Sequence, residues 1–274
     1  MAWKSLGLNK LVEFIDTHCH LNLENFKNDL DQVIERALEN GVTTFIVPGY
    51  DLETSRAAVT LAEKYPQVFA AIGIHPNSAF EWNQEILHEF NILSTHPKVA
   101  AIGEIGLDFY RNHATPQQQE EALLPQLELA AMNQLPVILH SRKAEQNMIE
   151  LLISDRFSDV IGVFHAFEGS LEQAAALTSH SFMIGAGGQI TYKKNEHHRQ
   201  LIASIPIYAM ILETDAPFLS PQQLRGTRNE PANIPIIADL AARLQNISLP
   251  EFAQQTTMNV LKIFQRIGFY RKAV

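Results

Sequence analysis

The chain of 274 residues has a single cysteine, no long apolar run and no block of like charge. One cysteine excludes an internal disulfide framework and fits a reducing compartment, so we expect a cytoplasmic protein. No stretch reaches the ~18 consecutive apolar residues of a membrane-spanning helix, so we expect no membrane partner. The apolar run within residues 1–12 is too short for a secretory signal, and we assign those residues no role.

Acidic residues outnumber basic ones by 30 to 21, which gives a formal net charge of −9. This balance argues against tight, extended binding to duplex nucleic acid, which needs many basic side chains facing phosphates. It does not exclude a nuclease that holds a few phosphates in a metal-lined pocket. Hydrophobic residues make up 46% of the chain and charged residues 19%, so a large core can form and wholesale disorder is excluded.

Short β-branched, apolar runs alternate with longer stretches of amphipathic, i, i+3, i+4 spacing. The apolar runs are almost continuous, as expected of strands that are buried on both faces. They predict strands at Glu13–His20, Thr43–Gly49, Val68–His75, Val99–Leu107, Pro136–Ser141, Gly162–Phe167, Ser181–Gly187 and Ala209–Asp215. The spacing between them predicts helices at Leu30–Glu39, Ser55–Lys64, Trp82–Leu93, Gln117–Asn133, Glu145–Ile153, Leu171–Ser179, Glu196–Ile205, Ile234–Leu244 and Pro250–Arg266.

Eight buried strands that alternate with helices predict a closed (β/α)8 TIM-like barrel of the α/β class. An open, doubly wound sheet is the alternative, but its G-x-G-x-x-G pattern is absent after the first strand. No internal repeat, low-complexity tract or Pro/Gly-rich linker marks a boundary, so we expect residues 1–274 to form one domain. We expect that domain to be a monomer.

Two histidines end the first expected strand, within Asp16-Thr17-His18-Cys19-His20. Residues i and i+2 of a strand share a face, so His18 and His20 should point one way and Cys19 the other. A lone buried histidine is usually a core residue with its hydrogen bonds satisfied. Two imidazoles on one face of a strand end can instead bind one metal ion.

Other expected strands also carry metal-ligand side chains toward their carboxyl ends. These residues are Glu104, His140, His165 and Asp215. The carboxyl ends of all barrel strands meet on one face, so these residues and the histidine pair should surround one pocket. Six ligands exceed the three or four of one catalytic zinc, which predicts two divalent metal ions with Glu104 as the bridge. Imidazole-rich ligation without thiolate favours Zn, Mn, Co or Ni over Mg, and such a pair of ions favours hydrolysis.

Several segments resemble the TatD family of metal-dependent deoxyribonucleases. The resemblance runs from about Glu13 to Phe264, with a family-like core of about 13–267. A segment with the pattern Gly-Gly-x-Ile-Thr-Tyr and the intact H-x-H are most similar to the YjjV-type branch. The matching motifs are Phe14-Ile15-Asp16-Thr17-His18-Cys19-His20-Leu21, Gly73-Ile74-His75-Pro76, Gly103-Glu104-Ile105-Gly106-Leu107-Asp108-Phe109-Tyr110, Leu135-Pro136-Val137-Ile138-Leu139-His140-Ser141-Arg142, Gly187-Gly188-Gln189-Ile190-Thr191-Tyr192, Glu213-Thr214-Asp215-Ala216-Pro217 and Arg228-Asn229-Glu230-Pro231.

The resemblance implies a TIM-like barrel with a dinuclear metal site that hydrolyses phosphodiester bonds. The implied substrate is nucleic acid, and the implied activity is a 3′-5′ exonuclease acting on single-stranded DNA ends. Asp215 is implied to bind metal and to orient or deprotonate the nucleophilic water. The ligand assignment implied by the motifs is His18 and His20 on one metal, His140 and His165 on the second, and Glu104 between them.

Further residues are candidates for contact with the substrate. His75 ends the third expected strand, where it would contact phosphate, transfer a proton or only hydrogen-bond to the next loop. Arg111, Arg142 and Arg228 are candidate phosphate-binding residues, because a guanidinium can bind a phosphate through two hydrogen bonds. Solvation or an ion pair with a nearby carboxylate is the alternative for each arginine. Glu168 stands where the family usually has serine, and a carboxylate there would either repel a phosphate or alter the range of substrates.

Two other functions remain open from the sequence. The same barrel and metals serve amidohydrolases and esterases, and some TatD relatives are linked to removing D-amino acids from tRNA. No lysine in an expected strand is available to bridge two metals by carbamylation, whereas Glu104 can bridge them directly. A non-catalytic, metal-stabilised binding module is the other possibility, and such a module would need no open coordination position.

Overall fold

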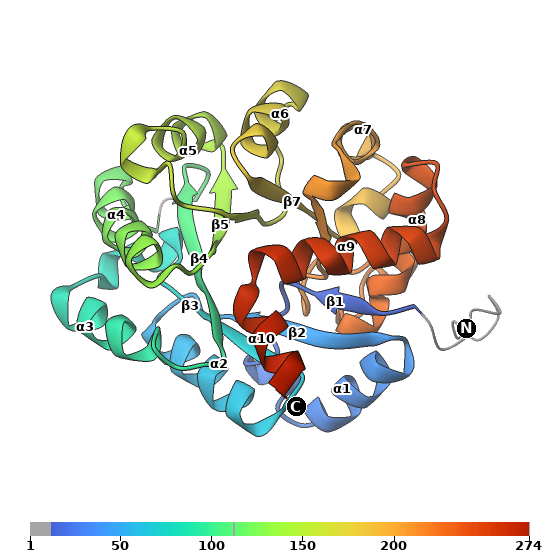
Figure 1. Cartoon of the computed structure of the whole chain (residues 1–274), viewed down its shortest axis with the longest axis horizontal. Coiled ribbons are helices and arrows are strands. Elements are labelled where there is room, and N and C mark those ends of the chain that lie inside the picture. Colours follow the sequence, from blue (N-terminus) through green and yellow to red (C-terminus); the bar gives the residue numbers. More distant parts are fainter. Residues whose placement is uncertain (1–11, 112, 274) are drawn as a thin grey trace.

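Eight parallel strands form the centre of the computed structural model, which describes residues 12–111 and 113–273. The sheet follows chain order from β1 to β8, with every neighbouring pair parallel (Figure 1). The strands are β1 (Phe14–Asp16), β2 (Val42–Pro48), β3 (Val68–Ile72), β4 (Val99–Asp108), β5 (Val137–Arg142), β6 (Gly162–Phe164), β7 (Phe182–Ala186) and β8 (Met210–Leu212).

The ring of strands closes just beyond the ends of β1 and β8. The backbone N–H of Thr17 donates to Leu212 O at 3.0 Å, and Cys19 pairs with Ala216 as an isolated parallel bridge. Helices lie around the outside of the strands in Figure 1. The predicted (β/α)8 TIM-like barrel is confirmed.

Helices follow the strands as the periodicity predicts. Capping boxes at Asp51/Thr54, Thr115/Gln118 and Ser170/Gln173 fix where α2, α4 and α6 begin. The α-helices are α1 (Leu30–Glu39), α2 (Leu52–Lys64), α3 (Gln84–Leu93), α4 (Pro116–Asn133), α5 (Glu145–Leu152), α6 (Leu171–Ser179), α7 (Glu196–Ser204), α8 (Ile234–Leu244), α9 (Leu249–Ile263) and α10 (Gln265–Ala273). Short 3-10 helices are η2 (Glu24–Phe26), η3 (Pro76–Glu81), η4 (Asp155–Phe157), η5 (Gly188–Thr191), η6 (Ile207–Ala209), η7 (Gln222–Leu224) and η8 (Pro231–Asn233). No helix in the described part of the chain has the length and apolarity needed to cross a bilayer.

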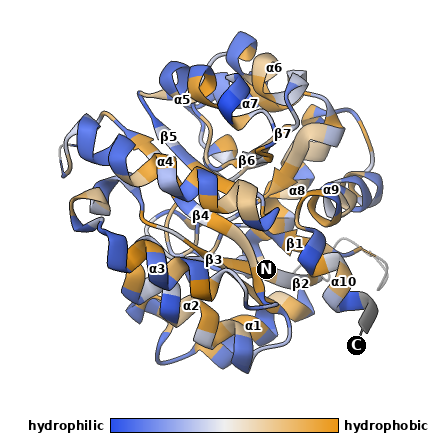
Figure 2. Ribbon diagram, turned by 60° about the vertical axis from the view of Figure 1, so that its left-hand side comes forward, coloured by the Kyte–Doolittle hydropathy of each residue, from blue (hydrophilic) through white to orange (hydrophobic). Residues whose placement is uncertain are grey.

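The barrel interior is apolar and is closed at its amino end by the last two helices. Every strand contributes to this inner cluster, which consists of Ile15, Ile46, Phe69, Ala71, Ala100, Ala101, Ile138, Val163, Met183, Ile211, Val260, Ile263, Phe264 and Ile267. Its last four members come from α9, α10 and the residue that joins them. The strands are mostly hydrophobic in Figure 2, whereas the surrounding helices carry hydrophilic stretches.

The prediction of one helix over Pro250–Arg266 is wrong. The chain leaves the helical region at Phe264, where φ is −90° and ψ is 68°, and α10 starts at the next residue. The side chain of Phe264 is fully buried among the inward-facing strand residues. The bend therefore lets α10 cross the end of the barrel, where it contacts β4.

The first strand is also shorter than predicted. It ends at Asp16 because the following residues pair with the chain beyond β8, so the H-x-H segment lies outside the regular strand. Asp16 stabilises this junction: its carboxylate accepts hydrogen bonds from the Thr214 hydroxyl at 2.6 Å and from the His18 backbone N–H at 3.2 Å. Burial raises the pKa of Asp16 to about 7.

Candidate metal centre

The six predicted ligands meet at the carboxyl ends of the strands. His18, His20, Glu104 and His165 are buried there, and Asp215 and His140 are partly buried. An open pocket of about 630 Å³ lies above them. Its lining consists of His20, Leu23, Tyr50, His75, Asn77, Ser78, Phe80, Glu104, Asp108, Arg111, His113, His140, Arg142, His165, Asp215 and Phe218.

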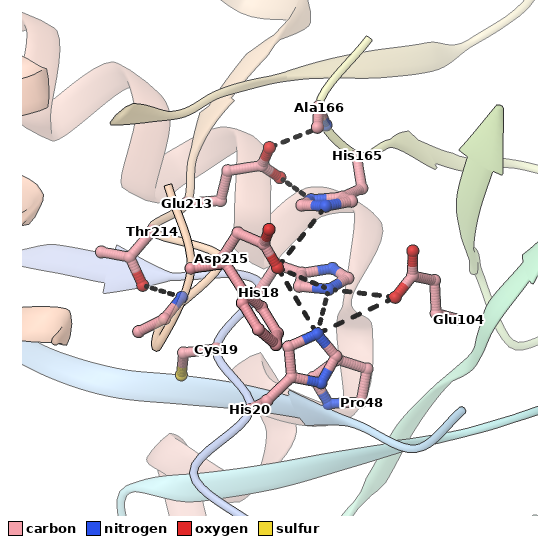
Figure 3. A network of polar contacts seen from close by, with 12 residues as sticks. His18, Cys19, His20, Pro48, Glu104, His165, Ala166, Glu213, Thr214 and Asp215 are labelled. Carbon is pink, nitrogen blue, oxygen red and sulfur yellow. Dashed lines mark hydrogen bonds and ion pairs between the residues drawn. The ribbon is translucent and has the colours of Figure 1, made fainter. Parts of the chain in front are cut away.

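Two imidazoles and two carboxylates form one half of the cluster (Figure 3). The Nε2 atoms of His18 and His20 lie 3.2 Å apart. Glu104 Oε2 lies 3.3 Å from His18 Nε2, and Asp215 Oδ1 lies 3.4 Å from His20 Nε2. Asp215 has a positive φ of 56°, a conformation that is strained for a residue with a side chain. A hydrogen bond from its backbone N–H to His18 O, at 2.8 Å, holds this conformation and fixes the two residues beside each other.

The other oxygen of Glu104 faces a second group of imidazoles. Glu104 Oε1 lies 3.0 Å from His140 Nδ1 and 3.6 Å from His75 Nε2. Glu104 is therefore the one carboxylate among the described residues whose two oxygens face different histidine groups in this way. This is the position that the sequence predicts for a bridging ligand.

The grouping of His165 differs from the ligand assignment that the sequence implies. Its ring stacks on that of His18, with centroids 3.6 Å apart, and its Nε2 lies 3.7 Å from Asp215 Oδ1. Within the described residues, the ligand atoms of His165 cluster with those of His18 and Glu104, whereas those of His140 cluster with His75 and Glu104. The sharing of one metal by His140 and His165 stays a prediction.

Two further carboxylates hold the outer nitrogens of two histidines. Glu213 Oε2 lies 3.0 Å from His165 Nδ1, and Asp108 Oδ2 lies 3.3 Å from His140 Nε2. A carboxylate on the outer nitrogen fixes the ring orientation and leaves the inner nitrogen free to bind metal. Gly185 makes room for this arrangement, because a Cβ there would lie 2.3 Å from Glu213 Oε2.

The sequence offers a signal for both carboxylates. Glu213 lies two residues before Asp215, and Asp108 lies four residues after Glu104 on the same strand, β4. These even spacings place side chains on one face of extended chain. Of these two pairs, the metal ligands predicted from the sequence include only Glu104 and Asp215.

His75 is held as a hydrogen-bond donor toward the pocket. Its Nδ1 accepts a hydrogen bond from the backbone N–H of Asn77 at 3.0 Å. A neutral imidazole whose Nδ1 accepts must carry its proton on Nε2, which is the atom that faces Glu104. Burial and the nearby His140 lower the pKa of His75 to about 3, so the ring is neutral near pH 7.

The charges of the cluster are strongly coupled. Burial alone would raise the pKa of Glu104, but the imidazoles of His18 and His75 and a hydrogen bond from His140 hold it well below its usual value. Burial alone would lower the pKa of His165, but Glu213 and Asp215 raise it to about 10. Glu104 is therefore ionised at neutral pH, and imidazoles surround it.

These residues fit divalent metal ions. Two nitrogens bound to one zinc-like ion at about 2.0–2.1 Å lie roughly 3.0–3.4 Å apart. The 3.2 Å separation between His18 Nε2 and His20 Nε2 falls in this range. Carboxylate oxygens of Glu104 and Asp215 face the same nitrogens, so the donor set is nitrogen and oxygen. The buried Cys19 thiol is turned toward Ile46 O instead, at 3.7 Å.

The candidate substrate contacts divide into two kinds. Arg111 and Arg142 line the pocket, and the guanidinium of Arg142 lies 4.0 Å from the centroid of the Tyr110 ring. Arg228 is not among the described residues that line it, because its guanidinium pairs with Asp29 at 2.6 Å. The exposed Glu168 also lies outside the lining, so it does not face a phosphate bound there.

Comparison with known proteins places the chain in a family. The family model described as TatD related DNase matches residues 15–265. The chain is 37% identical to the uncharacterized metal-dependent hydrolase YabD of Bacillus subtilis, covering 91% of this chain and 98% of YabD. It is 35% identical to the 3′-5′ ssDNA/RNA exonuclease TatD of Yersinia pseudotuberculosis, covering 92% and 99%.

A solved structure supports the same relationship. The crystal structure of YjjV from Escherichia coli, a TatD homologue, superposes with a TM-score of 0.88 at 34% identity, covering 93% of this chain and 99% of that one. The expected likeness to YjjV is thereby confirmed. The chain belongs to the TatD family of metal-dependent hydrolases.

Proposed function

We propose that this hydrolase uses two divalent metal ions to cleave phosphodiester bonds of DNA, as a 3′-5′ exonuclease on single-stranded ends. The observation that carries the proposal is the position of Glu104, whose Oε2 faces His18 while its Oε1 faces His140. The TatD relatives that are named as 3′-5′ ssDNA/RNA exonucleases support the choice of bond and substrate. The nitrogen-rich donor set favours Zn, Mn, Co or Ni over Mg.

The metal ions would lower the pKa of a water molecule and stabilise negative charge on the phosphoryl oxygens. Asp215 is placed to orient that water and accept its proton, since its carboxylate is held ionised by His165 and His20. His75 carries its proton on Nε2 and is placed to donate a hydrogen bond to a phosphate oxygen or to the leaving oxygen. Arg111 and Arg142, on the pocket wall, are placed to bind a phosphate.

Digestion of a 5′-labelled single-stranded oligonucleotide tests this function. The purified chain is stripped with a chelator and then supplied with Mn, Zn, Co, Ni or Mg. We expect products that shorten stepwise from the 3′ end, no cleavage before metal is added, and weaker activity with Mg. The His140→Ala variant should be inactive, whereas the exposed His88→Ala variant should match the wild type.

Chelator-insensitive cleavage, or full activity in His140→Ala, would exclude this mechanism. A parallel panel with D-aminoacyl-tRNA and cyclic amides separates the proposal from the amide- and ester-cleaving alternatives. Turnover of those compounds without any cleavage of oligonucleotides would assign the site to a different bond. Metal binding with no turnover of any substrate would indicate a binding module.

A further inference from the structure

One wall of the pocket is aromatic, and its rings are unusually exposed. Phe80, in η3, is 57% exposed, and Phe218, beyond β8, is 51% exposed. Both line the pocket together with Tyr50 and Leu23. Single exposed apolar side chains are common on proteins, but several gathered at the mouth of one pocket indicate a binding surface.

Phe218 lies directly beside the candidate metal ligands. Its ring centroid is 6.0 Å from that of His20, in an edge-to-face arrangement. Its backbone N–H donates to Asp215 O at 2.7 Å, so the aromatic residue and the carboxylate are parts of one turn. A group that binds to this ring therefore lies next to whatever binds between His20 and Asp215.

The turn that carries Phe218 is held rigidly by Asn229, which is fully buried. The Asn229 side chain donates to Thr214 O at 2.9 Å and to Phe218 O at 2.7 Å, and its backbone N–H donates to Pro217 O at 3.0 Å. Asn229 belongs to the motif from which the sequence singled out Arg228. These hydrogen bonds fix the backbone of the turn, so the half-exposed ring of Phe218 stands at the pocket mouth without being packed into the core.

The part of the pocket that follows β4 and β5 is basic. Arg111 and Arg142 come from the chain after β4 and from the end of β5, whereas Phe80 and Phe218 follow β3 and β8. The pocket thus offers cations on one wall, an aromatic surface on another and the metal ligands at its floor. A nucleotide has the matching three parts: a flat base, a scissile phosphate and a charged backbone on the far side.

We propose that Phe218, with Phe80 beside the same pocket, forms a stacking subsite for the nucleobase next to the scissile phosphate. This inference rests on the proposed phosphodiesterase function and specifies its substrate as a strand whose terminal base is unpaired. Base–aromatic stacking does not depend on which base is present, because every base has a π-face. A terminal base that is paired in a duplex must separate from its partner and from the neighbouring base before it can enter the pocket, so the subsite also selects against paired ends.

A pair of single-stranded oligonucleotides that differ only in the 3′-terminal residue tests the subsite. One ends in deoxyadenosine and the other in an abasic tetrahydrofuran residue, and kcat/KM for removal of that residue is measured with Mn present. We expect the wild type to prefer the base-bearing end by roughly tenfold, within the range of base–aromatic stacking. The preference should fall to about one in Phe218→Leu and be retained in Phe218→Tyr.

The control is Phe269→Leu, because Phe269 is 68% exposed on α10 at the other end of the barrel. This variant should keep the wild-type preference, and matching thermal unfolding of all variants excludes misfolding. Equal cleavage of both oligonucleotides by the wild type, or an unchanged preference in Phe218→Leu, would overturn the subsite while leaving the nuclease function intact. Absence of cleavage of either oligonucleotide by the wild type would overturn the proposed function and, with it, the subsite.

Discussion

The two ends of the barrel bury charge in opposite ways. At the carboxyl ends of the strands, carboxylates and imidazoles lie within 3–4 Å of one another, so each carboxylate there has imidazole partners. At the amino end, Lys98 is nearly buried without a carboxylate partner among the described contacts. Its Nζ donates to Pro66 O at 2.7 Å and lies 4.1 and 4.2 Å from the ring centroids of Phe69 and Tyr270.

Because of this difference, we expect the amino end of the barrel to contribute mainly to folding stability and the carboxyl end to contribute mainly to catalysis. The amino end is packed by an apolar cluster that includes Phe69, Phe264 and Ile267, and the Lys98 cation there is shielded by aromatic rings. The carboxyl end leaves a pocket of about 630 Å³ above a dense set of ionisable groups. Substitutions at the two ends should therefore separate loss of activity from loss of folding.

The largest effect is expected for Glu104→Gln, at the carboxyl end. An amide cannot replace the charge that faces both imidazole groups, so activity on an oligonucleotide should fall by about a thousandfold or more. Bound metal, measured on the purified protein, should fall with it, while the circular dichroism spectrum stays that of the wild type. The exposed Glu120→Gln should change neither quantity. More than a tenth of the wild-type activity in Glu104→Gln would contradict the assignment of the bridge.

Phe264→Ala should have the opposite phenotype. The side chain is fully buried between the strands and α10, so its truncation should lower the free energy of unfolding by about 3 kcal/mol or more. Urea denaturation measures this loss, and activity per folded molecule should be kept. Phe269→Ala, at an exposed position of α10, should stay within about 0.5 kcal/mol of the wild type. A loss of activity in Phe264→Ala as large as that of Glu104→Gln would contradict the claim that the amino end serves folding and the carboxyl end serves activity.

Glu213→Gln should have an intermediate effect. Glu213 holds the outer nitrogen of His165 and accepts a hydrogen bond from the Ala166 backbone N–H at 2.8 Å. Loss of such an orienting partner typically weakens metal affinity or activity about 10- to 100-fold. Competition with a chromogenic chelator measures the affinity. Unchanged affinity and activity would indicate that His165 is positioned by packing on His18 alone.

The smallest effect concerns the pH dependence of stability at the amino end. Burial lowers the pKa of Lys98 to about 8, below its ordinary value of 10.5, so between these values the unfolded chain binds more protons than the folded one. The free energy of unfolding should therefore rise with pH across this window, by about 1 kcal/mol between pH 8 and pH 9. Subtracting the same profile of Lys98→Met isolates this contribution. Parallel profiles of the two proteins would show that Lys98 is not perturbed by burial.

The sequence predicts the barrel well because both strands and helices are buried in a regular way. The helix predicted at Leu30–Glu39 has the same bounds in the structure, and the eight predicted strands all occur. The bend at Phe264 leaves no local signal, since Ile263 and Ile267 keep the i, i+4 spacing of one continuous helix. Only the space at the amino end of the barrel, which is filled by distant strands, determines where that helix breaks.

The sequence also predicts that the six ligands meet at one end of the barrel, because this inference needs only the direction of the strands. It does not predict how they group, since the stacking of His165 on His18 depends on side chains from strands at different positions in the ring. The sequence does not predict that Arg228 lies outside the pocket lining, for a similar reason. Its partner, Asp29, lies 199 residues away in the sequence, and no local pattern indicates their ion pair.

Anomalous diffraction from crystals grown with Mn²⁺ tests the central claim most directly. Two peaks are predicted at the carboxyl end of the barrel, one bound to Glu104 Oε2 beside His18 and His20, the other bound to Glu104 Oε1 beside His140. A single peak, or peaks that do not contact both oxygens of Glu104, would contradict the account of a carboxylate-bridged pair of metal ions.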